Sequence, residues 1–283
     1  MLVKPNTPQE IYPMNAFNKT LVACSVAAAC LFSTAASAAP ILNDFTVQPT
    51  AAAASQFTAD KIIGNYVEVA TFNPQAGTFA VSLVFDASAF VANDGKKNLD
   101  ATATGLGNSY ALYATYMATG TLSTDANGKT TFTYTPGSGT LSLFKDVMKD
   151  TTHTSEPANG TLPFQFQNTG DDIQLASGKA LTGYGSIDPT NQECIDGIFC
   201  GGFGSGTSFE LTDAGKAFFV QPSPFYNLSS QSGQLDSFEP VGTQTINGSL
   251  DVVFSNAVPE PASLGLLGLG LLGLGMTRRR KQS

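Results

Sequence analysis

Apolar and polar residues alternate over several short stretches of this chain. The clearest alternation covers residues 78–85, and its apolar members are Phe79, Val81, Leu83 and Phe85. Successive side chains of a strand point to opposite faces, so these four would share one face of a half-buried strand. Long amphipathic helical patterns are absent between residues 39 and 256. The pattern therefore predicts strands rather than helices.

Similar stretches recur along the chain, with glycine or proline between them. We predict further strands at 66–72, 110–115, 121–135, 140–144, 162–166, 172–175, 208–211 and 245–254. The stretch 121–135 favours a hairpin, because Asp125-Ala126-Asn127-Gly128 supplies its turn. Residues 142–149 also fit a short helix, and loops are expected at 151–160 and 229–236. These short strands favour an all-β fold, an antiparallel β-sandwich-like module, as one large domain or two small ones.

Charge is scarce and unevenly distributed. Charged residues make up 13% of the chain, against roughly 25% in ordinary soluble domains. Residues 39–256 hold 20 acidic residues, 8 lysines and no arginine. This excess of negative charge excludes nucleic acid as a partner, since its binding needs clustered lysine and arginine. It would also repel an anionic polysaccharide unless cations bridge the two, and it helps to keep an exported protein soluble.

The first part of the chain has the features of an export signal. Residues 21–36 are apolar or small, a lysine precedes them, and Ala36-Ser37-Ala38 gives a small-x-small cleavage site. We therefore predict a signal peptide over residues 1–38, cleaved after Ala38. Met14 is a second candidate start, because the residues from Met14 onward would begin a signal peptide by themselves.

The last part combines three features in a fixed order. Pro259-Glu260-Pro261 comes first, and an apolar run of leucine and glycine follows over residues 262–276. The basic residues Arg278, Arg279, Arg280 and Lys281 follow this run. A helix over the apolar run would be roughly 22 Å long, short of the ~30 Å hydrocarbon core, although flanking residues can compensate. The basic residues would remain in the cytoplasm, and the prolines would keep the peptide outside extended for a processing enzyme.

Residues 257–283 resemble the PEP-CTERM sorting signal in all three features. The resemblance implies a Gram-negative bacterium that makes exopolysaccharide. It implies processing by an exosortase, a membrane transpeptidase or protease, with removal of the tail. The protein would be anchored transiently in the inner membrane and then reach the cell surface or the extracellular matrix.

Three segments carry a second resemblance. Residues 39–47, 57–68 and 248–254 are similar to the flocculation-associated PEP-CTERM proteins. Such proteins are implicated in holding cells and exopolysaccharide together. The resemblance implies a protein that promotes cell aggregation, with exopolysaccharide as its partner, and the lack of catalytic groups indicates that it is not an enzyme.

Cys194 and Cys200 are the only cysteines beyond the predicted signal peptide. An even pair in an oxidising compartment predicts a disulfide, which would stabilise the fold by ~2–3 kcal/mol. A zinc site or a catalytic thiol is disfavoured because His153 is the only histidine of the chain. His153 itself is expected in a solvated loop.

Catalytic carboxylates are the main alternative chemistry. Asp171-Asp172 and the pair Glu193 and Asp196 are the visible acidic clusters. Glycoside hydrolysis needs two carboxylates facing one bond, whereas adjacent residues of a strand point apart. The sequence also lacks tryptophan and a Gly-x-Ser-x-Gly motif. No catalytic residue is assigned, and a polysaccharide hydrolase and a sugar- or small-ligand-binding module remain alternatives.

Calcium is the remaining candidate ligand. Asp94, Asp125 and Asp188 lie in turn-forming stretches and could offer oxygen ligands. None of them belongs to a twelve-residue loop that ends in glutamate. Turn formation explains these residues, so neither a metal nor a cofactor is expected.

Overall fold

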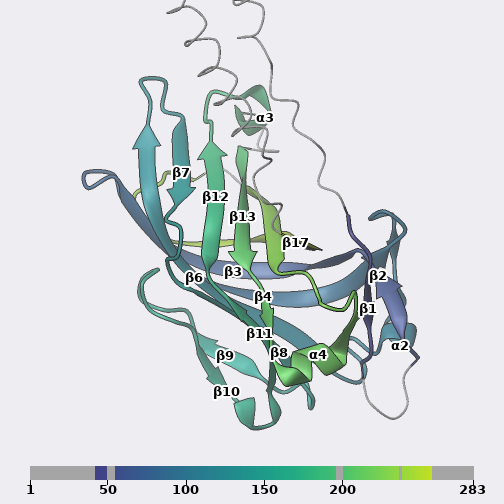
Figure 1. Cartoon of the computed structure of the whole chain (residues 1–283). Coiled ribbons are helices and arrows are strands. Elements are labelled where there is room, and N and C mark those ends of the chain that lie inside the picture. Colours follow the sequence, from purple (N-terminus) through teal and green to yellow (C-terminus); the bar gives the residue numbers. More distant parts are fainter. Residues whose placement is uncertain (1–41, 50–54, 196–199, 236–237, 257–283) are drawn as a thin grey trace, which may run out of the picture. The chain divides into compact units, whose positions relative to one another are not determined.

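The protein is predominantly β-structure in a computed structural model that describes residues 42–49, 55–195, 200–235 and 238–256 (Figure 1). Eight antiparallel strands hydrogen-bond in a closed ring, which forms a barrel. In the order of the ring these strands are β3 (Lys61–Asn73), β4 (Thr78–Ala92), β6 (Ala111–Thr124), β7 (Thr130–Tyr134), β12 (Ala180–Ile187), β13 (Gly201–Ser208), β16 (Leu228–Leu235) and β17 (Gly242–Ser255). The last strand, β17, pairs with β3 and closes the ring.

Strand β6 has two partners on one edge. Its first half pairs with β8 (Thr140–Asp146) and its second half with β7. Strands β11 (Ile173–Gly178) and β14 (Glu210–Leu211) continue the sheet beyond β8. The turn between β7 and β8 contains Gly139 at φ +67°, and a Cβ there would lie 1.7 Å from the carbonyl oxygen of Met117. Glycine at this position therefore allows the turn between β7 and β8 to pass close to β6, so that both strands can pair with the same edge of β6.

A small layer packs against one end of the barrel. It contains the three-stranded sheet β15 (Phe219–Gln221), β1 (Phe45–Val47) and β2 (Phe57–Ala59), together with helix α4 (Asp213–Phe218). Thr212 caps α4 by accepting a hydrogen bond of 3.0 Å from the Gly215 amide. The Phe45 ring contacts Phe254 of β17, with 5.1 Å between ring centroids. Aromatic packing thus fills this end of the barrel.

An excursion between β8 and β11 covers part of the outer surface. It contains β9 (Thr152–Ser155), β10 (Gln165–Gln167) and the 3₁₀ turn η1 (Thr169–Asp171). Phe164 packs there with Val69 and Val84, which face outward from β3 and β4. The Gly160 amide donates a hydrogen bond of 2.9 Å to the Thr71 hydroxyl. The excursion therefore buries the outer faces of β3 and β4, whose inner faces line the core.

The short elements that remain are β5 (Lys97–Asn98), α2 (Ala101–Thr104) and α3 (Gln192–Ile195). None of the helices in the described ranges is long and apolar enough to cross a membrane.

The all-β, antiparallel prediction is confirmed, and the strands close into a ring instead of forming two facing sheets. Residues 142–149 form no helix, since β8 extends to Asp146. Two loop predictions are wrong: β9 lies within 151–160, and 229–236 overlaps β16. His153 is exposed as expected, but it lies on β9 beside Phe164 rather than in a loop. Strands bounded on both edges by partners can tolerate polar sequences that local patterns do not identify.

Candidate functional site

The barrel encloses a cavity, here called the interior cavity, with a volume of about 50 Å³. Its walls are mainly apolar side chains from β4, β6, β8 and β17, such as Leu83, Leu112 and Leu250. A water molecule needs roughly 10–15 Å³ of such volume, so the interior cavity has room for a few waters or a short alkyl group.

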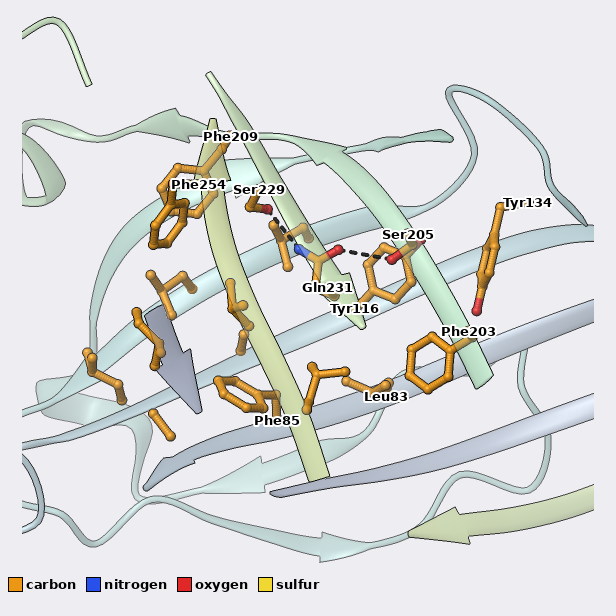
Figure 2. Close-up of a pocket in the computed structure, with 18 residues that line it drawn as sticks. Leu83, Phe85, Tyr116, Tyr134, Phe203, Ser205, Phe209, Ser229, Gln231 and Phe254 are labelled. Atoms are coloured by element: carbon orange, nitrogen blue, oxygen red, sulfur yellow. Dashed lines mark hydrogen bonds between the residues drawn. The ribbon is translucent and has the colours of Figure 1, made fainter. Parts of the chain in front are cut away.

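Three polar residues that line the interior cavity, Ser205, Ser229 and Gln231, are connected by hydrogen bonds (Figure 2). Ser205 donates a hydrogen bond of 2.9 Å to Gln231, and the Gln231 amide donates one of 2.8 Å to Ser229. Thr207 and Ser229 share a further hydrogen bond of 2.6 Å. Buried polar groups need such partners. This group therefore stabilises the pairing of β13 with β16.

A second, smaller space adjoins the interior cavity and is here called the Glu68 pocket. Its volume is about 30 Å³. Tyr134 and Phe203 line both spaces. The other residues that line the Glu68 pocket are Glu68, Phe72, Phe79, Val81, Phe132, Leu235, Phe238 and Ile246. Among the described residues the walls are thus mostly aromatic, and Glu68 is the one carboxyl group there.

Strand alternation places Glu68 inside the barrel. Tyr66, Glu68, Ala70 and Phe72 are alternate residues of β3 and are all buried. The Glu68 side chain is 7% exposed, and burial raises the pKa of its carboxyl group to about 7. Burial is the one cause of this pKa shift, and within the described ranges Glu68 forms no side-chain hydrogen bond or ion pair. The sequence predicts the strand 66–72 but does not single out Glu68, because Val67 and Val69 make the other face of this strand apolar as well.

The tyrosine hydroxyl groups around Glu68 are also buried. Burial raises the pKa of Tyr134 and of Tyr116 well above the ordinary value, and the nearby Glu68 carboxylate raises both further. Both tyrosines therefore remain neutral near pH 7. Tyr134 lines the Glu68 pocket, and Tyr116 lies close enough for an electrostatic interaction with Glu68.

A third space lies on the outside of the barrel and is here called the outer groove. It has a volume of about 440 Å³ between the outer faces of β4, β6 and β8 and the excursion that carries β10. The ring of Tyr113 stacks on Phe144, with 5.1 Å between centroids and 18° between planes, and contacts Phe166 at 5.2 Å. The outer groove is also lined by three threonines, which are Thr115, Thr140 and Thr169.

The predicted acidic pair Asp171-Asp172 lies beside the outer groove, and its two side chains have different partners. Asp172 accepts hydrogen bonds from the Tyr113 hydroxyl at 2.6 Å and from the Thr151 hydroxyl at 2.9 Å. Asp171 accepts one from the Met148 amide at 2.6 Å. The structure therefore does not bring these two carboxylates together on one site.

Asp171 also lies near two other carboxylates, those of Asp146 and Asp150, which the sequence did not group with it. Oxygen atoms of Asp146, Asp150 and Asp171 lie within 4.8 Å of one another. Asp146 accepts hydrogen bonds from the amides of Lys149 and Thr151, so its carboxylate holds the turn after β8. The cluster is explained by the turn, and we assign it no metal.

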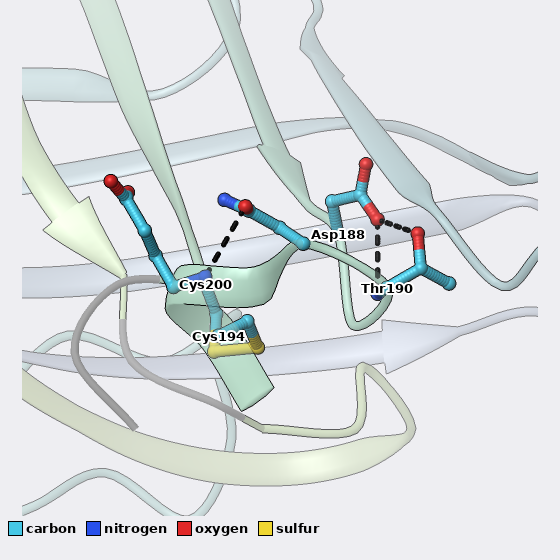
Figure 3. Close-up of a disulfide and its surroundings, with 6 residues drawn as sticks. Asp188, Thr190, Cys194 and Cys200 are labelled. Carbon is cyan, nitrogen blue, oxygen red and sulfur yellow. Dashed lines mark hydrogen bonds between the residues drawn. A yellow bond between two sulfur atoms is a disulfide. The ribbon is translucent and has the colours of Figure 1, made fainter. Parts of the chain in front are cut away.

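The predicted disulfide is present: Cys194 and Cys200 are bonded at 2.02 Å (Figure 3). The Cys200 amide donates a hydrogen bond of 3.1 Å to the carbonyl of Leu235, a residue that lines the Glu68 pocket.

The aspartates that could have offered calcium ligands have partners within their own turns. Asp188 accepts hydrogen bonds from the amide and hydroxyl of Thr190, which lower the pKa of its carboxyl group. Asp125 accepts from the amides of Asn127 and Lys129. Both aspartates thus form turns, as the sequence predicts.

The remaining predicted sites lie outside the described residues. They are the cleavage residues Ala36 and Ala38, the motif residues Pro259, Glu260 and Pro261, and the basic residues Arg278, Arg279, Arg280 and Lys281. Asp196 also lies outside them, whereas Glu193 lies on α3. The signal-peptide prediction and the domain boundaries stay predictions.

Comparison with known proteins gives a family match for the last residues of the sequence. Residues 257–281 match the family model of the PEP-CTERM protein-sorting motif. No curated protein and no solved structure matches the chain. The motif indicates an exported protein that is sorted through transient membrane anchoring. The chain therefore carries a PEP-CTERM sorting motif at residues 257–281, and this motif implies processing by an exosortase.

Proposed function

We propose that this protein acts without catalysis at the cell surface or in the extracellular matrix of a Gram-negative bacterium, where it promotes cell aggregation by associating with exopolysaccharide. The observation that carries the proposal is the aromatic outer groove on a protein with an exosortase sorting motif. The flocculation resemblance of the sequence supports the same function.

The chemistry of the outer groove suits sugar rings. A pyranose presents an apolar face of C–H groups and a rim of hydroxyl groups. Tyr113, Phe144 and Phe166 offer aromatic surface for the face, and the threonine hydroxyl groups can bond to the rim. The volume of about 440 Å³ lies within the ordinary range for binding sites. A neutral polysaccharide fits best, because residues 39–256 are strongly acidic.

A binding assay with exopolysaccharide purified from the bacterium that makes this protein tests the outer groove. The Phe144→Ala and Phe166→Ala variants should each bind the polysaccharide about tenfold more weakly, which corresponds to ~1.4 kcal/mol. The matched control is Tyr184→Ala, because Tyr184 is an exposed aromatic residue of β12 and does not line the outer groove. Circular dichroism should show all three variants folded. Equal affinity in all variants would contradict the assignment of the groove.

Cell aggregation tests the role of the whole protein. Deleting the gene should reduce floc formation while polysaccharide output stays normal. A gene that carries the Phe144→Ala and Phe166→Ala changes should restore flocs poorly, and the Tyr184→Ala gene should restore them fully. Unchanged flocculation after deletion would end the proposal. Release of reducing sugar ends by purified protein would instead favour the hydrolase.

A second candidate, a small-ligand-binding module, is favoured by one specific observation. The barrel contains a buried carboxyl group, Glu68, without a partner in the described ranges, in a space that shares lining residues with a further cavity. Ligand binding there does not exclude a role in the matrix, because the outer groove and the Glu68 pocket lie on opposite faces of the sheet.

A further inference from the structure

The Glu68 carboxyl group lies in an environment that no part of the proposed matrix function explains. It faces the Glu68 pocket from β3, among six aromatic side chains. An ionised carboxylate buried among apolar groups costs several kcal/mol unless a partner compensates it. A fold with only a structural need for this position would place an apolar residue there, like Ala70 and Phe72 on the same face.

The walls of the pocket decide which cation could be the partner. Calcium takes six to eight oxygen ligands, whereas Glu68 and Tyr134 are the only polar side chains among the described residues that line this pocket. Aromatic rings attract organic ammonium ions instead, through the negative charge of the ring face. The rings of Phe72, Phe79 and Phe132 pack with centroids 5.6–6.4 Å apart. This set of groups suits a nitrogen cation with C–H groups rather than a metal ion.

The two adjoining spaces set the size of the ligand. The Glu68 pocket, at about 30 Å³, has room for an ammonium head group. The interior cavity, at about 50 Å³, shares Tyr134 and Phe203 with the Glu68 pocket and has mainly apolar walls. A short hydrocarbon chain that occupied the interior cavity would remove apolar surface from water, which is favourable.

We propose that the barrel binds a small alkylammonium ion, with its nitrogen at the Glu68 carboxylate and its hydrocarbon chain in the interior cavity. Glu68 forms the ion pair and accepts N–H hydrogen bonds from the ligand. Tyr134 offers a further oxygen acceptor. The aromatic walls exclude water and contact the C–H groups next to the nitrogen.

Isothermal titration calorimetry with butylammonium chloride tests this proposal on the full chain in a non-ionic detergent at pH 8. We expect saturable binding of one ion per chain. Glu68→Gln keeps the size of the side chain and removes its charge, so it should weaken binding at least about tenfold. The matched control Glu210→Gln changes an exposed glutamate of β14 and should leave the affinity within about twofold. Butanol should bind more weakly than butylammonium, because it has no charge to pair with Glu68.

Two results would overturn the proposal: equal affinity in the wild-type and Glu68→Gln proteins, or absence of binding at millimolar butylammonium. If Glu68→Gln does not fold, the carboxyl ¹³C resonance of Glu68 in the wild-type protein replaces the variant. As butylammonium is added, that resonance should shift and reach saturation at the same concentration as the heat of binding. A resonance that stays constant would refute the ion pair. Polysaccharide binding by the outer groove should be unchanged in Glu68→Gln, so the two proposals can fail separately.

Discussion

The hydroxyl group of Tyr113 donates a hydrogen bond of 2.6 Å to the carboxylate of Asp172. Tyr113 faces outward from β6, and Asp172 follows the turn η1 of the excursion. The bond therefore attaches the excursion to the barrel at the outer groove. Burial, and then this hydrogen bond, raise the pKa of the Tyr113 hydroxyl group.

Tyr113→Phe should reduce stability without removing the aromatic ring of the groove. Asp172 loses one of two side-chain donors, and a hydrogen bond to a charged group contributes about 1.5–3 kcal/mol. Urea unfolding should show a loss of that size. Tyr184→Phe removes an exposed hydroxyl group and should change stability by less than about 0.5 kcal/mol. Equal losses in both variants would mean that the bond does not hold the excursion.

Glu68 should make the protein less stable as the pH rises from about 4.5 to about 7. The pKa of Glu68 is about 7 in the fold and 4.5 as its ordinary value, so the folded state binds more protons than the unfolded state between these values. Its stabilising effect is complete below pH 4.5 and is lost as the pH passes 7. Tyr116 and Tyr134, which face Glu68 from β6 and β7, stay neutral over this range.

Urea unfolding of the wild-type and Glu68→Gln proteins at pH 5 and pH 8 measures this dependence. A shift of this size corresponds to about 3 kcal/mol. The variant should therefore gain up to that amount relative to the wild type between the two pH values. A difference between the proteins that is the same at both pH values would show that Glu68 does not titrate in the fold.

The disulfide should contribute stability through its short loop. Cys194 and Cys200 are six residues apart, and closing so small a loop stabilises the folded state by about 2 kcal/mol. The double variant Cys194→Ser, Cys200→Ser should lose that amount in thermal unfolding. Reduction of the wild-type protein should have the same effect, and it should have none on the double variant. A loss in the variant alone would point to packing of the buried side chains.

The matched sorting motif predicts the mass of the mature protein. Exosortase processing at residues 257–281 should remove the basic end of the chain, so protein from the culture should lack peptides that contain Arg278, Arg279 and Arg280. Mass spectrometry of digested material checks this. Glu260→Gln should leave a larger, membrane-bound form. Intact tails in the extracellular protein would contradict processing.

The sequence identifies individual strands better than their arrangement. The alternation in 78–85 predicts the part of β4 that has apolar side chains toward the core. Strand β16 was missed because its sequence, LSSQSGQL, is mostly serine, glutamine and glycine. It is held as a strand by pairing with β13 on one edge and β17 on the other. Closure through β17 and β3 joins residues far apart in sequence, which local patterns do not reveal.

The sites follow the same division. The disulfide is predictable because two cysteines leave a single pairing. Glu68 lies in a predicted strand, 66–72, but its inward direction depends on which face meets the core. The outer groove needs an excursion that sequence analysis partly interpreted as a loop, so Phe166 and Tyr113 could not be brought together. Local pattern thus gives elements, whereas sites arise from contacts between distant elements.

The bend between β7 and β8 offers a test of the barrel itself with an internal control. Gly137 and Gly139 both have positive φ, at +77° and +67°. Alanine at either position costs about 1–2 kcal/mol of backbone strain. At Gly137 nothing lies within 4 Å of the added Cβ, so backbone strain is the whole loss of stability there. At Gly139 the Cβ would lie 1.7 Å from the Met117 carbonyl oxygen, so β8 must move away from β6.

Gly139→Ala should therefore be less stable than Gly137→Ala by at least about 1 kcal/mol, as measured by urea unfolding. Amide hydrogen exchange should locate the difference at the β6–β8 pairing, because that pairing takes up the displacement. Protection of β3 and β17, which lie elsewhere in the ring, should be reduced much less. Equal stability of the two variants would mean that the bend relaxes freely and that close approach at Gly139 does not fix the path of the chain.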